Sequence, residues 1–115
     1  MNDEQRRELQ ADLERLVQGL QDSLRAMTEQ SAAVELDQPA VGRLSRMDAI
    51  QQQQMADAQR RRVQQRLGQV RAALKLSATD DYGECRRCGD DIAFARLKAK
   101  PESPYCVPCV RELGG

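Results

Sequence analysis

Four cysteines in the last third of the chain are the residues best suited to chemistry. Cys85 and Cys88 form one C-x-x-C pair, Cys106 and Cys109 form a second, and seventeen residues separate the pairs. Each short pair lets two thiolates converge from one tight turn, and two such turns can complete a tetrahedron around Zn²⁺. Gly89, directly after the first pair, favours such a turn. The spacing therefore predicts one zinc ion held by four thiolates.

A zinc ion with four thiolate ligands has no open position for a water molecule, so this ion is expected to be structural. The chain has no histidine, and it lacks a nucleophile–base pair and a phosphate-binding loop, so we expect no enzymatic activity. Two redox-active motifs or two disulfides are the alternative interpretation of the cysteines. A thioredoxin-like motif would need a surrounding α/β sheet, which the rest of the chain does not suggest.

The residues before position 80 are typical of long helices, because Leu, Ala, Gln, Arg and Glu dominate there. Apolar residues recur every three or four positions in a first stretch up to Met27, and again seven positions later at Val34 (Leu9, Leu13, Leu16, Leu20, Leu24, Met27, Val34). A second stretch begins near Leu44 and ends near Ser77 (Met47, Ile50, Met55, Ala58, Val63, Leu67, Val70, Leu74). Pro39 and Gly42 predict a turn at about 36–43.

These patterns predict a mostly α-helical fold with two parts. Residues 1–78 are expected to form a long antiparallel helical hairpin that resembles an imperfect coiled coil, with its tip at about 36–45. Residues 79–115 are expected to form a small four-cysteine zinc finger with a short C-terminal helix. A large core is not expected, because the chain has only one Phe, two Tyr and no Trp. In the hairpin, the second apolar stretch is expected to face the first, with Leu9 beside Val70.

The charge of the chain and its first residues bear on its partners and its location. Lys plus Arg and Asp plus Glu both total 18, so no net field draws the protein onto nucleic acid or a membrane. The first nine residues are charged where a secretory signal would be apolar, so we expect a cytoplasmic monomer, in a compartment where thiols stay reduced. The second stretch carries an arginine cluster (Arg60, Arg61, Arg62, Arg66). This cluster is either a solvated face balanced by Glu8, Asp12 and Glu14, or a docking or phosphate patch.

A family becomes recognisable in the cysteine region. The segment DYGECRRCGDDI (81–92), followed by ARLKAKP (95–101) and YCVPC (105–109), closely resembles the zinc finger of the DksA/TraR family. The resemblance implies a bacterial transcription regulator that binds RNA polymerase directly, without recognising a DNA sequence. It also implies that the tip of the coiled coil enters the secondary channel of the polymerase and modulates initiation. The alternative is a small zinc-ribbon adaptor that binds another protein or nucleic acid.

The expected tip departs from the family pattern. Well-studied members carry an acidic D-x-x-D-x-A motif there, whereas this chain reads DQPAVGRLS over 37–45. The candidate tip residues are Asp37, Arg43, Ser45, Arg46 and Asp48. Asp37 is either a tip residue or a simple turn residue, and Ser45 with Asp48 could equally start the second helix.

Some family members bind guanosine tetraphosphate where the finger meets the polymerase. The resemblance implies basic ligands on the second arm and a lysine after the last cysteine. Arg62 and Arg66 are candidates for such docking, but the matching positions include Gln69 and Val110. We therefore expect weak or absent dependence on this nucleotide.

Overall fold

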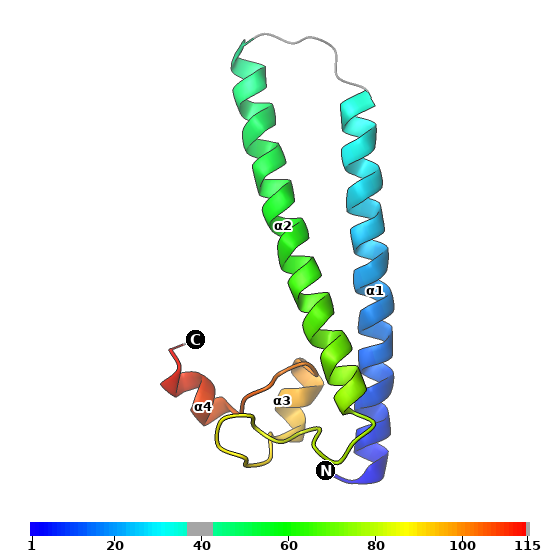
Figure 1. Ribbon diagram of the computed structural model, residues 1–115, viewed down its shortest axis with the longest axis vertical. Helices are drawn as coiled ribbons and strands as arrows, with labels where there is room; N and C mark the ends of the chain where they lie inside the picture. Colours follow the sequence, from blue (N-terminus) through cyan, green and yellow to red (C-terminus); the bar gives the residue numbers. More distant parts are fainter. Residues whose placement is uncertain (37–42, 115) are drawn as a thin grey trace. The chain divides into compact units, whose positions relative to one another are not determined.

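Four helices account for the regular structure within residues 1–36 and 43–114 (Figure 1). A computed structural model describes residues 1–36 and 43–114 and, within these, the side chains of residues 1–30 and 46–114. The helices are α1 (Asp3–Leu36), α2 (Arg43–Leu76), α3 (Phe94–Ala99) and α4 (Val107–Glu112). The predicted fold class is confirmed, because α1 and α2 form the antiparallel hairpin and two short helices follow. The predicted turn after Leu36 lies outside the described residues.

The chain divides into two compact units. The finger unit comprises Met1–Val17 and Gly68–Gly115, and the hairpin unit comprises Gln18–Leu67. The first turns of α1 and the last turns of α2 therefore belong with the cysteine region. The expected domain boundary between residues 78 and 79 stays a prediction. Within 1–36 and 43–114, no helix is both long and apolar enough to span a membrane.

The core of the finger unit collects apolar residues from three helices. Leu9, Leu13, Val70 and Leu97 are fully buried, and Tyr82 and Ile92 are nearly so. Leu9 and Leu13 lie one helical turn apart on α1, so a single face of this helix supplies both. At the start of α1, the side chain of Asn2 accepts a hydrogen bond from the amide of Gln5 at 2.7 Å, and the side chain of Gln5 accepts one from the amide of Asn2. This reciprocal cap sets where the helix begins.

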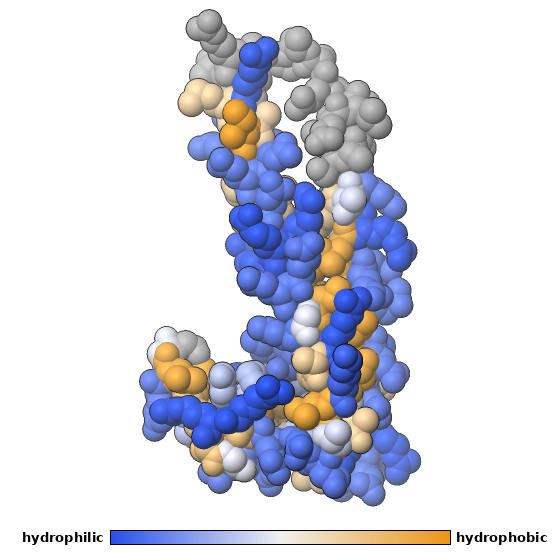
Figure 2. Space-filling view, in the orientation of Figure 1, coloured by the Kyte–Doolittle hydropathy of each residue, from blue (hydrophilic) through white to orange (hydrophobic). Residues whose placement is uncertain are grey.

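The hairpin unit has a less apolar interior than the sequence suggested. Leu20, Leu24 and Met27 of α1 are half-buried, as are Ala58 and Val63 of α2. The three apolar residues expected to continue the second stretch are instead 58 to 71% exposed (Met47, Ile50, Met55). At 100° per residue, they lie roughly 100 to 160° from Leu67 around the helix axis. The prediction that they face the first stretch was therefore wrong, and apolar surface is visible near the beginning of α2 (Figure 2).

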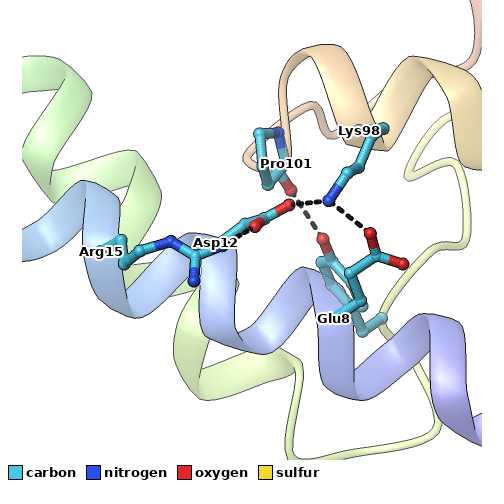
Figure 3. Close-up of polar contacts among 6 residues, drawn as sticks. Glu8, Asp12, Arg15, Lys98 and Pro101 are labelled. Carbon is cyan, nitrogen blue, oxygen red and sulfur yellow. Dashed lines mark hydrogen bonds and ion pairs between the residues drawn. The ribbon is translucent and has the colours of Figure 1, made fainter.

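Ion pairs join one arginine of the cluster and two acidic residues of α1 to different partners. Arg60 forms an ion pair with Asp57 of its own helix at 2.9 Å. Glu8 and Asp12 of α1 instead bind Lys98 of α3, at 2.7 and 2.8 Å (Figure 3). Periodicity along α1 and α2 could not have indicated this partner, because Lys98 lies in the finger. The interpretation that Glu8, Asp12 and Glu14 balance the cluster stays a prediction.

Candidate metal centre

The first cysteine pair lies in a turn closed by backbone hydrogen bonds. The amide of Gly89 donates to the carbonyl oxygen of Cys85 at 2.9 Å, and the amide of Cys85 donates to the carbonyl oxygen of Asp90 at 2.8 Å. Gly89 has a φ of 78°, a conformation that costs little only for glycine. An isolated bridge between Glu84 and Asp91 continues the pairing just outside the turn. These bonds direct the thiols of Cys85 and Cys88 toward the same point.

The second cysteine pair is fixed by the start of a helix. Cys106 is the N-cap of α4, and Pro108 occupies the first turn, where its missing amide proton costs nothing. The amide of Val110 donates to the carbonyl oxygen of Cys106 at 3.0 Å, which brings Cys109 round to the side of Cys106. The two turns are tied together by the amide of Arg86, which donates to the carbonyl oxygen of Pro104 at 2.9 Å.

The four sulfur atoms form one compact cluster, and their spacing suits a metal ion. All four Sγ atoms lie within 4.8 Å of one another, and Cys88 Sγ lies 3.7 Å from Cys106 Sγ. A tetrahedral zinc ion with Zn–S bonds near ~2.3 Å requires sulfur–sulfur distances of about 3.8 Å. Cys85 and Cys109 are buried and Cys88 is exposed. The cluster therefore fits Zn²⁺ with all four cysteines as ligands.

The electrostatics of the cluster favour a divalent cation. Burial raises the pKa of Cys85, but the backbone amides of Cys88, Cys106 and Arg87 outweigh burial and lower this pKa to about 6. The hydrogen bond with Cys106 and burial raise the pKa of Cys109 to about 12. One thiolate thus forms readily, whereas a second one close to it is disfavoured. A bound divalent cation would offset this repulsion and hold all four thiolates together.

Arg87 is a neighbour of the cluster that the sequence analysis did not single out. Its side chain pairs with the carboxylate of Glu112 and hydrogen-bonds the thiol of Cys109, and both contacts raise the pKa of the Arg87 guanidinium. A fixed positive charge beside a site of four thiolates reduces the net negative charge of the bound centre. The available signal was the position of Arg87 between the two cysteines of the first pair.

The other predicted site residues lie on α2 or outside the described residues. Asp37 is outside them. Arg43 and Ser45 lie in the first turn of α2, and Arg46 and Asp48 are exposed on the same helix. The two residues proposed for docking are also exposed on α2 (Arg62 and Arg66). The roles expected for these residues at the tip and in docking stay predictions.

Comparison with known proteins places the cysteine region in a family. Residues 80–112 match the family model of the prokaryotic dksA/traR C4-type zinc finger. Over 40 residues, the chain is 42% identical to the RNA polymerase-binding transcription factor DksA of Haemophilus influenzae, covering 35% of this chain and 28% of that protein. It is 35% identical over 40 residues to DksA of Escherichia coli, covering 35% of this chain and 26% of that protein. These matches span less than a third of the length of either relative.

A solved structure extends the similarity to the whole fold. Transcription factor DksA2 from Pseudomonas aeruginosa superposes with a TM-score of 0.85, covering 98% of this chain and 85% of that chain. Because the sequence identity is 23%, this likeness shows a shared fold.

Proposed function

Because residues 80–112 form a DksA/TraR C4-type zinc finger, we propose that this protein is a bacterial transcription regulator that binds RNA polymerase directly. The observation that carries the proposal is the cluster of four sulfur atoms inside the segment that matches the family. The curated relatives named DksA are RNA polymerase-binding transcription factors, and the shared fold with DksA2 supports the same role. The protein acts by binding in the cytoplasm, as a monomer, and not as an enzyme.

The zinc ion is single and structural in this proposal. When bound, it cross-links the two C-x-x-C turns and supplies no open coordination position. Cys85, Cys88, Cys106 and Cys109 would hold it, and Arg87 would offset part of the negative charge of the thiolates. Metal analysis of the purified protein should give one zinc per chain, with four thiols that react with Ellman's reagent only after unfolding or chelation. Four freely reactive thiols in a folded, metal-free protein would contradict this assignment.

In this proposal, the helical hairpin is the part of the protein that regulates transcription. Its tip enters the secondary channel of the polymerase and changes the kinetics or stability of promoter complexes, with Asp37, Arg43 and Arg46 as the residues that act there. Arg62 and Arg66 of α2 contribute to docking. Gln69 and Val110 stand where basic residues would meet guanosine tetraphosphate, so the response to this nucleotide is weak or absent.

The test combines binding and transcription with purified polymerase. Wild-type protein should bind core polymerase and compete with a Gre-type secondary-channel factor. Replacing Asp37, Arg43 and Arg46 by Ala should change transcript yield while binding persists. Arg25→Ala, an exposed arginine of α1, is the matched control and should change neither. Absence of binding by folded, zinc-loaded protein would refute the proposal and favour an adaptor that binds another protein.

A further inference from the structure

The short helix α3 depends on its surroundings for stability. It has six residues, from Phe94 to Ala99, and isolated helices shorter than ~12 residues are marginal in water. Its start lacks a side-chain cap, so the backbone alone does not hold it. Two features of the finger unit hold it instead: the fully buried Leu97 and the neighbouring Lys98.

Lys98 joins α3 to the first turns of α1 (Figure 3). Its Nζ atom lies 2.7 Å from Glu8 Oε1 and 2.8 Å from Asp12 Oδ2. Glu8 and Asp12 are four residues apart on one helix face, where like charges repel each other. The ammonium group lies between the two carboxylates and cancels this repulsion. Arg15 pairs with the same Asp12 carboxylate, on the side away from Lys98.

The charges of Asp12 and Lys98 persist around neutral pH. The hydrogen bond from Lys98 holds the pKa of Asp12 below its usual range. Asp12 and, after it, Glu8 raise the pKa of Lys98. The Asp12 side chain is only 15% exposed, against 42% for Lys98 and 48% for Glu8. Solvent and salt therefore screen the bond to Asp12 less than the bond to Glu8.

The hydrogen bonds that close the two cysteine turns do not involve this contact. They join Gly89 to Cys85, Cys85 to Asp90, and Val110 to Cys106. Phe94 comes six residues after Cys88, and Ala99 comes seven residues before Cys106. The bonds that hold the two cysteine turns reach Asp90 on one side of α3 and Pro104 on the other, so the hydrogen bonds within α3 can open locally without breaking them.

From these contacts we infer that Lys98 is a charge-dependent clamp that fastens α3 to α1, and that α3 opens more often when the clamp is lost while the four-cysteine centre stays closed. The clamp makes the attachment of α3 to α1 dependent on ionic strength. Metal binding at the cysteines does not share this dependence. The inference concerns the finger unit itself and does not rest on polymerase binding.

Amide hydrogen exchange on the zinc-loaded protein tests the clamp. The amides of Leu97 and Lys100, which bond to the carbonyl oxygens of Ala93 and Arg96, report the opening of α3. Lys98→Met should speed their exchange about tenfold, the effect expected from losing two partly exposed ion pairs. Lys100→Met is the matched control, because Lys100 makes no ion pair within residues 1–36 and 43–114, and it should leave Leu97 exchange unchanged. Zinc content should stay constant in both variants.

Salt and a compensated variant complete the design. Raising the salt from about 0.05 to about 0.5 M should speed α3 exchange in the wild type and have little effect in Lys98→Met. Replacing Glu8 by Gln and Asp12 by Asn in the Lys98→Met background should recover part of the protection, because the repulsion between the two carboxylates is gone. Equal exchange in Lys98→Met and Lys100→Met would overturn the inference. Loss of zinc together with α3 opening would overturn it as well.

Discussion

Replacing Tyr82 by Phe removes one hydrogen-bond donor and one titratable group from the core of the finger unit. The Tyr82 hydroxyl donates to the carbonyl oxygen of Pro101 at 2.9 Å, and the residue is only 5% exposed. Burial, followed by the negative charges of Glu102 and Asp12, raises the pKa of Tyr82 to about 12. The substitution therefore acts in opposite directions at neutral and at alkaline pH.

The size of each effect follows from the structure. At pH 7 the variant loses one buried hydrogen bond, which lowers the free energy of unfolding by about 1 kcal/mol. A raised pKa means that the wild-type phenol stabilises the fold fully below pH ~10 and loses this contribution as the pH rises through ~12. The wild type thus loses roughly 1 kcal/mol by pH ~11 and roughly 3 kcal/mol at complete ionisation. The variant keeps its stability over this range, so the order of stability should reverse between pH ~10 and ~11.

Two measurements check this reversal. Denaturant unfolding of zinc-loaded wild type and Tyr82→Phe from neutral to alkaline pH gives the difference in unfolding free energy directly. Because the chain has two tyrosines, subtracting the phenolate absorbance of the variant from that of the wild type isolates the titration of Tyr82. A midpoint near the ordinary value of 10.0, or a stability difference that does not change with pH, would refute the reasoning.

Packing and backbone geometry give further expectations for the same unit. Leu97→Ala should lower the free energy of unfolding by about 3 kcal/mol, because Leu97 is fully buried, whereas Val107→Ala at a 39% exposed position should cost less than about 1 kcal/mol. Similar losses in denaturant unfolding would show that Leu97 does not anchor α3. Gly83→Ala and Gly89→Ala should each cost about 1–2 kcal/mol, because both residues have positive φ. An added Cβ at Gly83 would also lie 2.9 Å from the Met1 side chain, whose flexible end can shift. Only Gly89→Ala should speed zinc loss to a chelator, and equal rates would contradict the role of Gly89 in the cysteine turn.

Local signals in the sequence were sufficient for much of the architecture. Helix α1 ends at Leu36 and helix α2 begins at Arg43. Both limits follow from Pro39 and Gly42, because these residue types disfavour helix through their own backbone properties. The convergence of Cys85 with Cys88 depends on only three peptide units and one turn, so the spacing alone indicates it.

Local signals could not predict contacts between segments that lie far apart in the sequence. Lys98 meets Glu8 across ninety positions, and a single charged residue has no periodicity that would reveal its partner. The exposure of Met47, Ile50 and Met55 shows a different limit. The spacing of three between Met47 and Ile50 is compatible with one apolar helix face, but these positions lie away from Leu67 when the angle is followed along the whole helix.

The composition of the finger unit determines the order in which the protein can fold during synthesis. This unit joins Met1–Val17 to Gly68–Gly115. Its first segment therefore cannot form its contacts until the second segment has been translated. Residues 18–67 are complete when the ribosome has yet to translate any cysteine. The first turns of α1 gain Leu97 and Lys98 as partners only after residues 18–67 have been translated, and Cys106 and Cys109 emerge later still. Contacts this remote in sequence close slowly, so α1 pairs with α3 only after the hairpin unit has been translated, and zinc capture requires Cys106 and Cys109 to have emerged.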